Sequence, residues 1–389
     1  MNVERLLHRP SSRRLSRRKR ILFTVLTAIF VVMFVETSLQ IFYRMSVGRW
    51  LWEWWAIPIF EADPVRVYRV KANLDYTHKT SEFTARYFTD ELGMRTQKGK
   101  QSPTIAKPDN VFRILSFGPS FAFGWGVNYE DAYMFQIAGA LRVPGKRVEL
   151  INLGTPSQPP CYQLKWLKEI GHRYQPDLIV QTVYGGFQEL DADDTLPASL
   201  PSVRSGCLYP SDKMTLSMWA RRMRTYSAIL FYGWHFYNAL HSSSSSTGDG
   251  REFYTKANSG PVATDDDVRR YGRYIDFVHA AATNKPDVVF LFIPLSHVIR
   301  PADVTRVTHS GRGPNPFDAR EKARQMTSLL QSNHWHVINP TDVLVQKDKA
   351  TRMYNLYDIH FTPAGNKAVA DYALPIIQDV IGSHSSADR

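Results

Sequence analysis

The sequence predicts an α/β protein in three layers, a parallel sheet covered by helices on both faces, preceded by one transmembrane helix. Five apolar runs alternate with helical patterns between residues 111 and 385. An uncharged run follows a basic N-terminal arm. The chain has 389 residues, of which 43% are hydrophobic, so it can bury the core of one large domain.

Residues 1–20 form a basic arm that is expected to stay in the cytoplasm. The arm holds eight arginines and lysines against one glutamate, which gives it +7 of the formal net charge of +12. The rest of the chain therefore carries only a small excess of positive charge. A charge of +12 would suggest nucleic-acid binding, but its concentration in a short arm argues against that class.

Residues 21–43 are predicted to be a transmembrane signal anchor. The run 21–35, ILFTVLTAIFVVMFV, carries no charge. The whole segment would span about 34 Å, enough for a bilayer core. The basic flank places the N-terminus in the cytoplasm and the rest of the chain in the periplasm, anchored to the inner membrane. No small-x-small site follows the run, so an uncleaved anchor is favoured over a cleaved signal peptide or a buried core helix.

Two features mark the outer end of this segment. Glu36 either contacts a partner helix or reaches the membrane interface, and its depth favours the interface. Four tryptophans follow within six residues, and they indicate either an aromatic belt at the outer surface or core aromatics of the next domain. They are Trp50, Trp52, Trp54 and Trp55.

Residues 44–110 are predicted to form a membrane-proximal, β-rich segment. The stretches VRVYRV (65–70) and FTARYFT (83–89) alternate apolar and polar residues, as half-buried strands do. The β-rich part of the segment is expected to end near Gly93-Met94-Arg95.

Residues 111–385 are expected to form the α/β domain. Continuous apolar strands that alternate with helices predict a parallel sheet buried on both faces, with its binding site at the carboxyl ends of the strands. Ser120, Gly154, Gly186 and His297 would lie at that edge. The predicted strands are 112–117, 147–153, 177–184, 287–295 and 336–340. The predicted helices are 130–142, 161–174, 265–285, 317–332 and 363–381.

The alternation is interrupted by an insertion at 191–264. It contains the aromatic, basic run 218–240 and the flexible link HSSSSSTGDG at 241–250. The run is either a lid or partner-docking element, or an ordinary surface helix beside a loop. Cys161 and Cys207 are the only cysteines, and they are either a disulfide pair or two unpaired thiols.

Two short stretches carry the residue types of nucleophilic catalysis. Ser120 follows an apolar strand on a Gly-Pro-Ser turn, which is how several hydrolases expose a nucleophile. Asp358 and His360 stand two apart before a helix opened by Thr362-Pro363. In an extended segment they share a face, so the carboxylate could orient the imidazole toward the serine.

These stretches resemble the SGNH/GDSL hydrolase family over residues 111–381. The similarity is greatest to its membrane-anchored bacterial members and to the related surface-polysaccharide O-acyltransferases and esterases. FGPSFAFGWGV is similar to the family's first block, G-D-S-F-x-F-G-x-G-V, and Asn152-Leu153-Gly154 to its second. Asp358-Ile359-His360 with the following Pro363 and Gly365 is similar to the last block. The Leu92-Gly93-Met94-Arg95 lead-in also looks like the membrane-bound subgroup.

The resemblance implies a role for each of these residues. Ser120 would attack an ester carbonyl, His360 would take its proton, and Asp358 would orient His360. The backbone N–H groups of Ser120 and Gly154 would hold the oxyanion. The resemblance implies no metal or organic cofactor. By their positions, Asn152, Gly186 and His297 are candidates for lining the substrate site, although a polar loop position is the better interpretation of His297.

Two departures from the family pattern bear on activity. Pro119 replaces the aspartate that precedes the nucleophile, and proline lacks an N–H. The stretch 183–194 has no asparagine where the family's third block supplies an oxyanion donor, although Gln188 could supply an amide. Losing one such donor costs on the order of 10²–10³ in rate.

The sequence thus supports two function classes. The first is an esterase or O-acyltransferase acting on acylated surface carbohydrate. The second is an impaired or inactive relative that binds glycan or a membrane acyltransferase partner. Nucleic acid is expected as a partner in neither class.

Overall fold

The computed structural model describes residues 16–47, 50–52, 57–80, 82–185, 190–198, 200–209, 223–224, 226–241, 265–301, 316–356 and 358–387. At its centre is a five-stranded parallel sheet in the order β12-β11-β8-β6-β7. The strands are β6 (Val111–Phe117), β7 (Arg147–Asn152), β8 (Leu178–Tyr184), β11 (Asp287–Ile293) and β12 (His336–Ile338). All five were expected from their apolar runs, and the predicted α/β class is confirmed.

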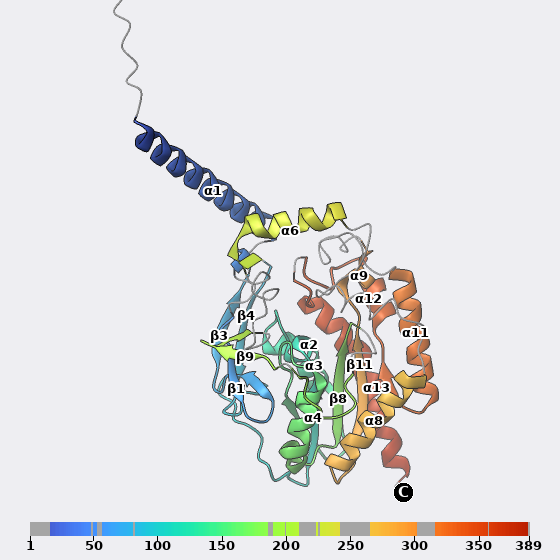
Figure 1. Cartoon of the computed structure of the whole chain (residues 1–389). Helices are drawn as coiled ribbons and strands as arrows, with labels where there is room; N and C mark the ends of the chain where they lie inside the picture. Colours follow the sequence, from blue (N-terminus) through green and yellow to red (C-terminus); the bar gives the residue numbers. More distant parts are fainter. Residues whose placement is uncertain are drawn as a thin grey trace, which may run out of the picture.

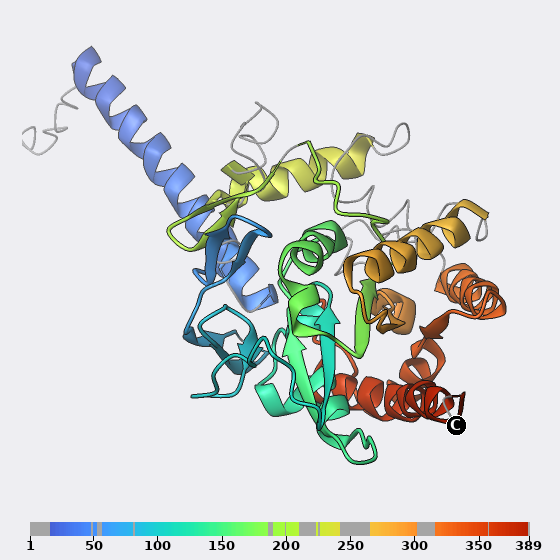
Figure 2. The same cartoon turned by 90° about the horizontal axis from the view of Figure 1, so that it is seen from below.

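Helices cover both faces of this sheet (Figure 1, Figure 2). Alternate residues of a strand point to opposite faces, so Ile114 joins one core cluster while Leu115 joins the other. On the Ile114 face lie α3 (Tyr133–Ala140), α12 (Thr341–Lys347) and α13 (Pro363–Ala387). On the Leu115 face lie α4 (Pro160–Glu169), α8 (Asp265–Ala281) and α11 (Pro316–Ser332).

The long apolar helix at the N-terminus is α1 (Arg17–Val47). Its most apolar window of 18 residues, within Arg17–Ser46, has a mean hydropathy of 2.2 and no buried residue, so the helix is long and apolar enough to cross a membrane. By length and composition, this helix fits either a signal anchor or a signal peptide. It projects away from the α/β domain in Figure 1.

Short antiparallel strands lie between α1 and the large sheet. They are β1 (Phe60–Asp63), β2 (Val67–Val70), β3 (Asp75–Lys79), β4 (Thr84–Thr89) and β5 (Arg95–Thr96). Strands β1 and β2 form one sheet, and β3, β4 and β5 form another. Strands β2 and β4 fall within the two alternating stretches of the sequence.

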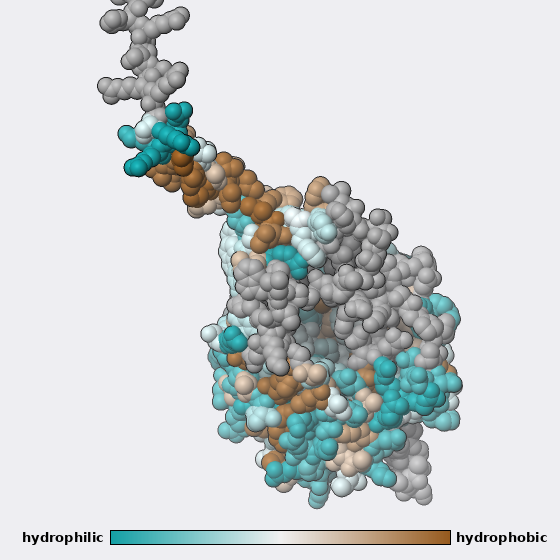
Figure 3. All heavy atoms as spheres, in the orientation of Figure 1, coloured by the Kyte–Doolittle hydropathy of each residue, from teal (hydrophilic) through white to brown (hydrophobic). Residues whose placement is uncertain are grey.

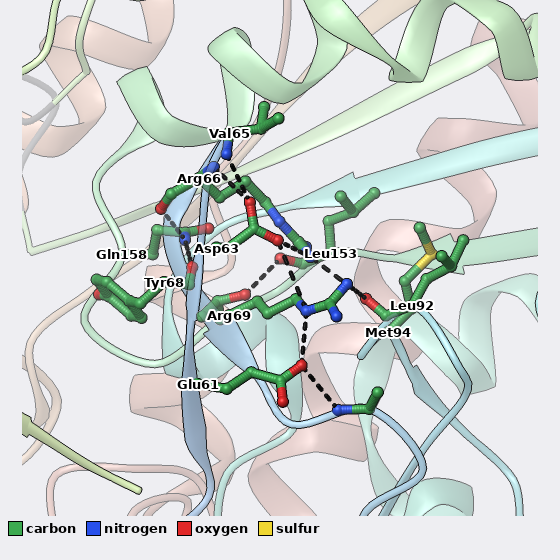
Figure 4. Close-up of polar contacts among 12 residues, drawn as sticks. Glu61, Asp63, Val65, Arg66, Tyr68, Arg69, Leu92, Met94, Leu153 and Gln158 are labelled. Atoms are coloured by element: carbon green, nitrogen blue, oxygen red, sulfur yellow. Dashed lines mark hydrogen bonds and ion pairs between the residues drawn. The ribbon is translucent and has the colours of Figure 1, made fainter. Parts of the chain in front are cut away.

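A polar network joins the β1–β2 hairpin to the α/β domain (Figure 4). The buried guanidinium of Arg66 lies 3.4 Å from Asp63 and donates to the carbonyl oxygen of Leu92. The Gln158 amide, from the loop after β7, donates to the carbonyl oxygens of Arg66 and Tyr68 at 3.3 and 2.8 Å. Because these groups are buried, their hydrogen bonds fix the hairpin against that loop.

The described part of the insertion contributes a hairpin and a helix. The hairpin pairs β9 (Ser202–Arg204) with β10 (Cys207–Tyr209), and the helix is α6 (Ala228–His241). Helix α6 packs on the end of α1, where the Glu36 carboxylate accepts hydrogen bonds from the start of α6. Glu36 therefore contacts a partner helix, supplied by its own chain, whereas its depth had favoured the interface.

Four details complete the comparison with the sequence. Three short helices had not been expected: α2 (Ser120–Phe123), α9 (Ser296–Ile299) and α12. Cys161 and Cys207 are unpaired thiols. Trp50 stacks on Trp52 with ring centroids 4.9 Å apart. Trp54, Trp55 and most of the link 241–250 lie outside the described residues.

Candidate active site

Ser120 stands at the carboxyl end of β6, as the first residue of α2. The turn before it depends on Gly118, whose φ of 143° is a conformation that side chains rarely adopt. A Cβ at Gly118 would also lie 2.6 Å from the Cβ of Thr182 on β8. Pro119 supplies the N-cap position with φ −78° and ψ −152°. Proline is therefore compatible with this turn.

The turn directs Ser120 toward His360. The Ser120 Oγ lies 2.5 Å from the His360 Nε2, although 240 residues separate them in the chain. On the other side of the ring, the His360 Nδ1 is hydrogen-bonded to the Asp358 carboxylate. A carboxylate only accepts, so Nδ1 carries the proton and Nε2 is left to accept from the serine hydroxyl.

Asp358 also fixes the backbone of its own loop. Its Oδ1 accepts the His360 backbone N–H at 2.9 Å, and its Oδ2 is 3.4 Å from the indole Nε1 of Trp125. Both Asp358 and His360 are largely shielded, with side chains 11% and 10% exposed. Hydrogen bonds in such a site are held with little competition from water.

Glu82, from the turn between β3 and β4, holds this loop from outside the α/β domain. Its Oε2 accepts the Asp358 backbone N–H at 2.8 Å, and its Oε1 accepts the backbone N–H of Leu356. Sequence reasoning missed Glu82 because nothing near it in the chain signals a site. The β-rich segment thus helps to build the site.

Aromatic rings close the sides of the His360 imidazole. The Phe121 and Trp125 rings lie 4.8 and 5.6 Å from it, centroid to centroid. The Trp125 ring in turn meets the edge of His78, at 4.8 Å. These rings restrict the imidazole to one orientation and keep it in an apolar setting.

Arg95 gives the Leu92-Gly93-Met94-Arg95 motif a structural role. Its buried guanidinium donates to the carbonyl oxygens of Phe123, Gly124 and Val127, at 3.3, 3.4 and 3.1 Å. It also stacks between the rings of Tyr87 and Phe123, at 4.5 and 4.7 Å. Burial lowers the pKa of Arg95 from 12.5 to about 10, so the guanidinium stays charged at neutral pH. Arg95 thereby fixes the run that follows the serine.

Asn152 and Gly154 connect the end of β7 to α2. The Gly154 backbone N–H donates to the Asn152 Oδ1 at 2.8 Å, and the Asn152 Nδ2 donates to the Ala122 carbonyl oxygen at 2.8 Å. A Cβ on Gly154 would lie 2.3 Å from the Phe123 backbone nitrogen, so only glycine allows this approach. The predicted oxyanion donor at Gly154 therefore lies beside α2, with its N–H already bonded to Asn152.

Two predicted lining residues do not face an open surface. Asn152 is 1% exposed and its amide serves the protein interior, so the structure differs from a substrate-lining role there. His297 is completely buried in α9, and neither of its ring nitrogens is hydrogen-bonded to a residue in the described part of the chain. Desolvation lowers its pKa from 6.5 to about 4. The polar loop position that the sequence suggested for His297 is therefore wrong.

The remaining predicted positions, Gly186 and Gln188, lie outside the described residues. Within the described ranges there is no group of three or more His, Cys, Asp or Glu side chains that could hold a metal ion.

The fold and this arrangement define an α/β protein with a serine, a histidine and an aspartate in triad geometry. No protein-family model and no curated protein matches the chain. Several solved structures are similar in fold, and three of them are described next.

A lipolytic G-D-S-L family protein from Veillonella parvula is 11% identical, with TM-score 0.36, and covers 68% of this chain and 97% of its own. A lipase/acylhydrolase from Enterococcus faecalis is 13% identical, with TM-score 0.33, covering 69% and 96%. An acetylxylan esterase from Geobacillus stearothermophilus is 10% identical, with TM-score 0.35, covering 68% and 94%. Similarities this low carry no argument about function.

Proposed function

We propose that this protein is a serine-dependent esterase or O-acyltransferase of the SGNH/GDSL type, acting on acylated surface carbohydrate. It would be held at the inner membrane by α1, with its α/β domain in the periplasm. The observation that carries the catalytic part is the 2.5 Å separation of the Ser120 Oγ and the His360 Nε2, with Asp358 on the far side of the ring. This is the geometry that a general base needs before any substrate binds.

The chemistry follows from the protonation state of the histidine. His360 takes the hydroxyl proton as the Ser120 oxygen bonds to the ester carbonyl carbon, and Asp358 stabilises the imidazolium that forms. Collapse of the tetrahedral intermediate breaks the bond to the alcohol, which leaves with the proton from His360. An acyl group then remains on Ser120. Water or a sugar hydroxyl, deprotonated by His360, takes that acyl group and restores the serine.

The negative charge on the substrate oxygen needs hydrogen-bond donors. Ser120 is the first residue of α2, where a backbone N–H has no intrahelical acceptor, so its N–H is one candidate donor. The Gly154 N–H is the second, and it would have to turn from Asn152 or be shared with it. We assign the third position to Gln188. A hole completed by a flexible side chain would be slower than one built on asparagine.

Two observations favour a second candidate function. The Gly154 N–H is already satisfied by Asn152 at 2.8 Å, and Pro119 takes the place of a carboxylate. An oxyanion hole with a committed donor fits an impaired or inactive relative that binds glycan or a membrane acyltransferase partner. The two candidates differ in one measurable property, the reactivity of the Ser120 hydroxyl.

Labelling with a fluorophosphonate probe separates them. The full chain in nanodiscs is compared with Ser120→Ala, with Pro119→Asp, and with Ser332→Ala on α11 as a control serine. Labelling of the parent and of the Ser332→Ala variant, lost in Ser120→Ala, is the expected result. No labelling in the parent but labelling in Pro119→Asp would indicate a hydrolase silenced at one residue. No labelling in either would favour the binding function.

A further inference from the structure

A side chain of α1 binds the N-terminal end of α6. The Glu36 carboxylate accepts the backbone N–H groups of Ala228 and Ile229 at 2.6 and 3.0 Å, and the Ser227 hydroxyl at 2.9 Å. These are groups that the first turn of a helix leaves without an intrahelical acceptor. A carboxylate at this end of a helix is also favoured by the helix dipole. Glu36 is thus the N-terminal cap of α6, supplied by another helix.

Other side chains also connect α1 to the start of α6, and we call this set of contacts, with the cap, the joint. The Gln40 amide of α1 donates to the Tyr226 carbonyl oxygen at 3.1 Å and is itself 5% exposed. One turn further along α1, Tyr43 meets the edge of the Phe231 ring, with centroids 5.4 Å apart. The joint therefore holds α6 at a fixed place, across the end of the domain from which α1 leaves (Figure 1).

The opposite side of α6 carries large apolar side chains that the domain does not cover. They recur at intervals of three or four residues, which places them on one face of the helix. They are Leu230, Trp234 and Tyr237 of α6, together with Tyr226 two residues before it, and they are 47%, 40%, 53% and 50% exposed. Near this face, the Arg224 guanidinium lies 4.0 Å from the Trp234 ring centroid. Aromatic rings with polar tips, beside a cation, are typical of a membrane interface.

The position of the joint along α1 agrees with that chemistry. Glu36 lies about 22 Å along the helix from Ile21, and Tyr43 about 33 Å. A hydrocarbon core is about 30 Å thick, so α6 joins α1 at the outer boundary of the layer that α1 would span. Exposed apolar side chains also lie on the α1 side of this contact, since Ile41, Phe42 and Met45 of α1 are 45%, 58% and 81% exposed. Phe42 also contacts the Tyr232 ring of α6, at 6.0 Å. Figure 3 shows the apolar surface of α1 reaching the domain.

We propose that α6 is a membrane-interface helix whose Tyr226–Leu230–Trp234–Tyr237 face lies at the boundary of the acyl chains and headgroups of the bilayer. The occupant of this face is lipid because α6 joins α1 at the outer boundary of the layer that α1 would span. The inference rests on the anchoring part of the proposed function, the retention of α1, and is independent of the Ser120 chemistry. With two points of contact, α1 and α6, the domain cannot rotate freely about its anchor.

The test measures the depth of one α6 residue in the bilayer. The full chain is reconstituted in vesicles of phosphatidylethanolamine and phosphatidylglycerol, with Cys207→Ser to remove the more accessible thiol. Cys161 is buried and is left in place. A nitroxide is attached at Tyr237→Cys and, as a matched control, at Tyr372→Cys on α13, where the native tyrosine is 37% exposed. Collisions with oxygen, which concentrates in lipid, are compared with those of a water-soluble nickel complex.

The expected result is that the label at position 237 collides several-fold more with oxygen and several-fold less with nickel than the label at position 372. Equal nickel accessibility at both positions would overturn the proposal. Low accessibility to both agents at position 237 would overturn it too, because it would indicate a protein cover such as a second copy of the chain. Should Tyr237→Cys not fold, a second measurement tests whether the α6 face contacts lipid. It compares the quenching of tryptophan fluorescence by doxyl-labelled lipid in the parent and in Trp234→Phe. The Trp234→Phe variant is expected to lose a lipid-quenched component, and unchanged quenching would count against the proposal.

Discussion

Glu82 connects two parts of the chain that are 276 residues apart, the β3–β4 turn and the loop that carries Asp358. The Glu82 carboxylate accepts hydrogen bonds from the backbone N–H groups of Leu356 and Asp358. Both of these bonds are to backbone groups, and neither involves the serine or the histidine ring. Its effect on catalysis therefore runs through the position of the Asp358 loop, which makes it a positioning residue.

Replacing Glu82 with alanine is expected to lower kcat/KM for a simple aryl ester roughly 10–100-fold, since small displacements of catalytic groups cost about that much. Glu82→Gln keeps one acceptor oxygen but turns an NH2 group toward the other backbone N–H, so it should lose less activity than Glu82→Ala without reaching the parent level. The fall is expected in kcat rather than in KM, and in the rate of fluorophosphonate labelling. Equal losses in the two variants, or a loss confined to thermal stability, would contradict the positioning role.

His297 makes the stability of the fold depend on pH. Its pKa is about 4 in the folded protein against 6.5 when solvated, so between these values the unfolded chain binds more protons. Stability is therefore fully present above pH 6.5 and is lost as the pH falls toward 4, by up to about 3 kcal/mol from this residue.

The variant His297→Leu should flatten this pH dependence. Denaturant unfolding at pH 7 and pH 5 measures it, and the parent should lose more stability than the variant between the two. His334→Asn is the control, because it removes an exposed imidazole from a turn whose positive φ suits asparagine. A parallel fall in the parent and in His297→Leu would show that other groups govern the acid limit.

At the scale of elements, the sequence predicts what burial dictates and misses what tertiary contacts dictate. Strands β6, β8 and β11 are continuous apolar runs because both faces of the sheet are covered, so composition alone locates them. Helix α2 has only four residues, and packing against β8 and the loop after β7 determines it. The bond from Glu36 to α6 is equally invisible, since 192 residues separate Glu36 from Ala228.

The same distinction applies to the candidate site. Ser120, Asp358 and His360 were identified because each stands in a short motif with a chemical rationale. Glu82 was not identified, because it acts through backbone groups far away in the sequence. Arg95 stood in a motif, but its contacts with the carbonyl groups after Ser120 could not be predicted for the same reason. Asn152 was assigned to the substrate surface, whereas the structure uses its amide to tie β7 to α2. A motif therefore indicates which residue is special, and only the fold shows what that residue contacts.

The approach of the β7 loop to α2 leads to a prediction about two glycines. Gly154→Ala would place a methyl group 2.3 Å from the Phe123 nitrogen, so the loop or α2 must shift. We expect a lower melting temperature and slower labelling of Ser120. Gly139→Ala is the matched control, because α3 offers that methyl group open space. It should stabilise the helix by up to about 1 kcal/mol. Labelling that is unchanged in Gly154→Ala would show that α2 tolerates the displacement.

At the scale of the whole molecule, α1 contributes more to the structure than a leader that is removed would. Glu36 and Gln40 are bonded to α6, and Tyr43 is 4% exposed within the joint. Cleavage within or after α1 would remove the carboxylate that caps α6. It would also expose the side of α6 that carries Phe231, which packs against Tyr43. Contacts made by a signal peptide would be lost when it is removed and could not stabilise the mature domain. The contacts of α1 with the rest of the chain therefore favour its retention.

We therefore expect the mature protein to retain α1 and to remain in the membrane fraction after a high-salt wash. Mass spectrometry of the membrane-extracted protein checks whether the residues of α1 are present. Protease added to spheroplasts should digest the α/β domain and spare residues 1–20, as the basic flank implies. Glu36→Ala should leave membrane retention unchanged but make α6 more accessible to the protease. A shortened chain released with the periplasmic proteins would refute the anchor and would remove the basis for placing α6 at the membrane.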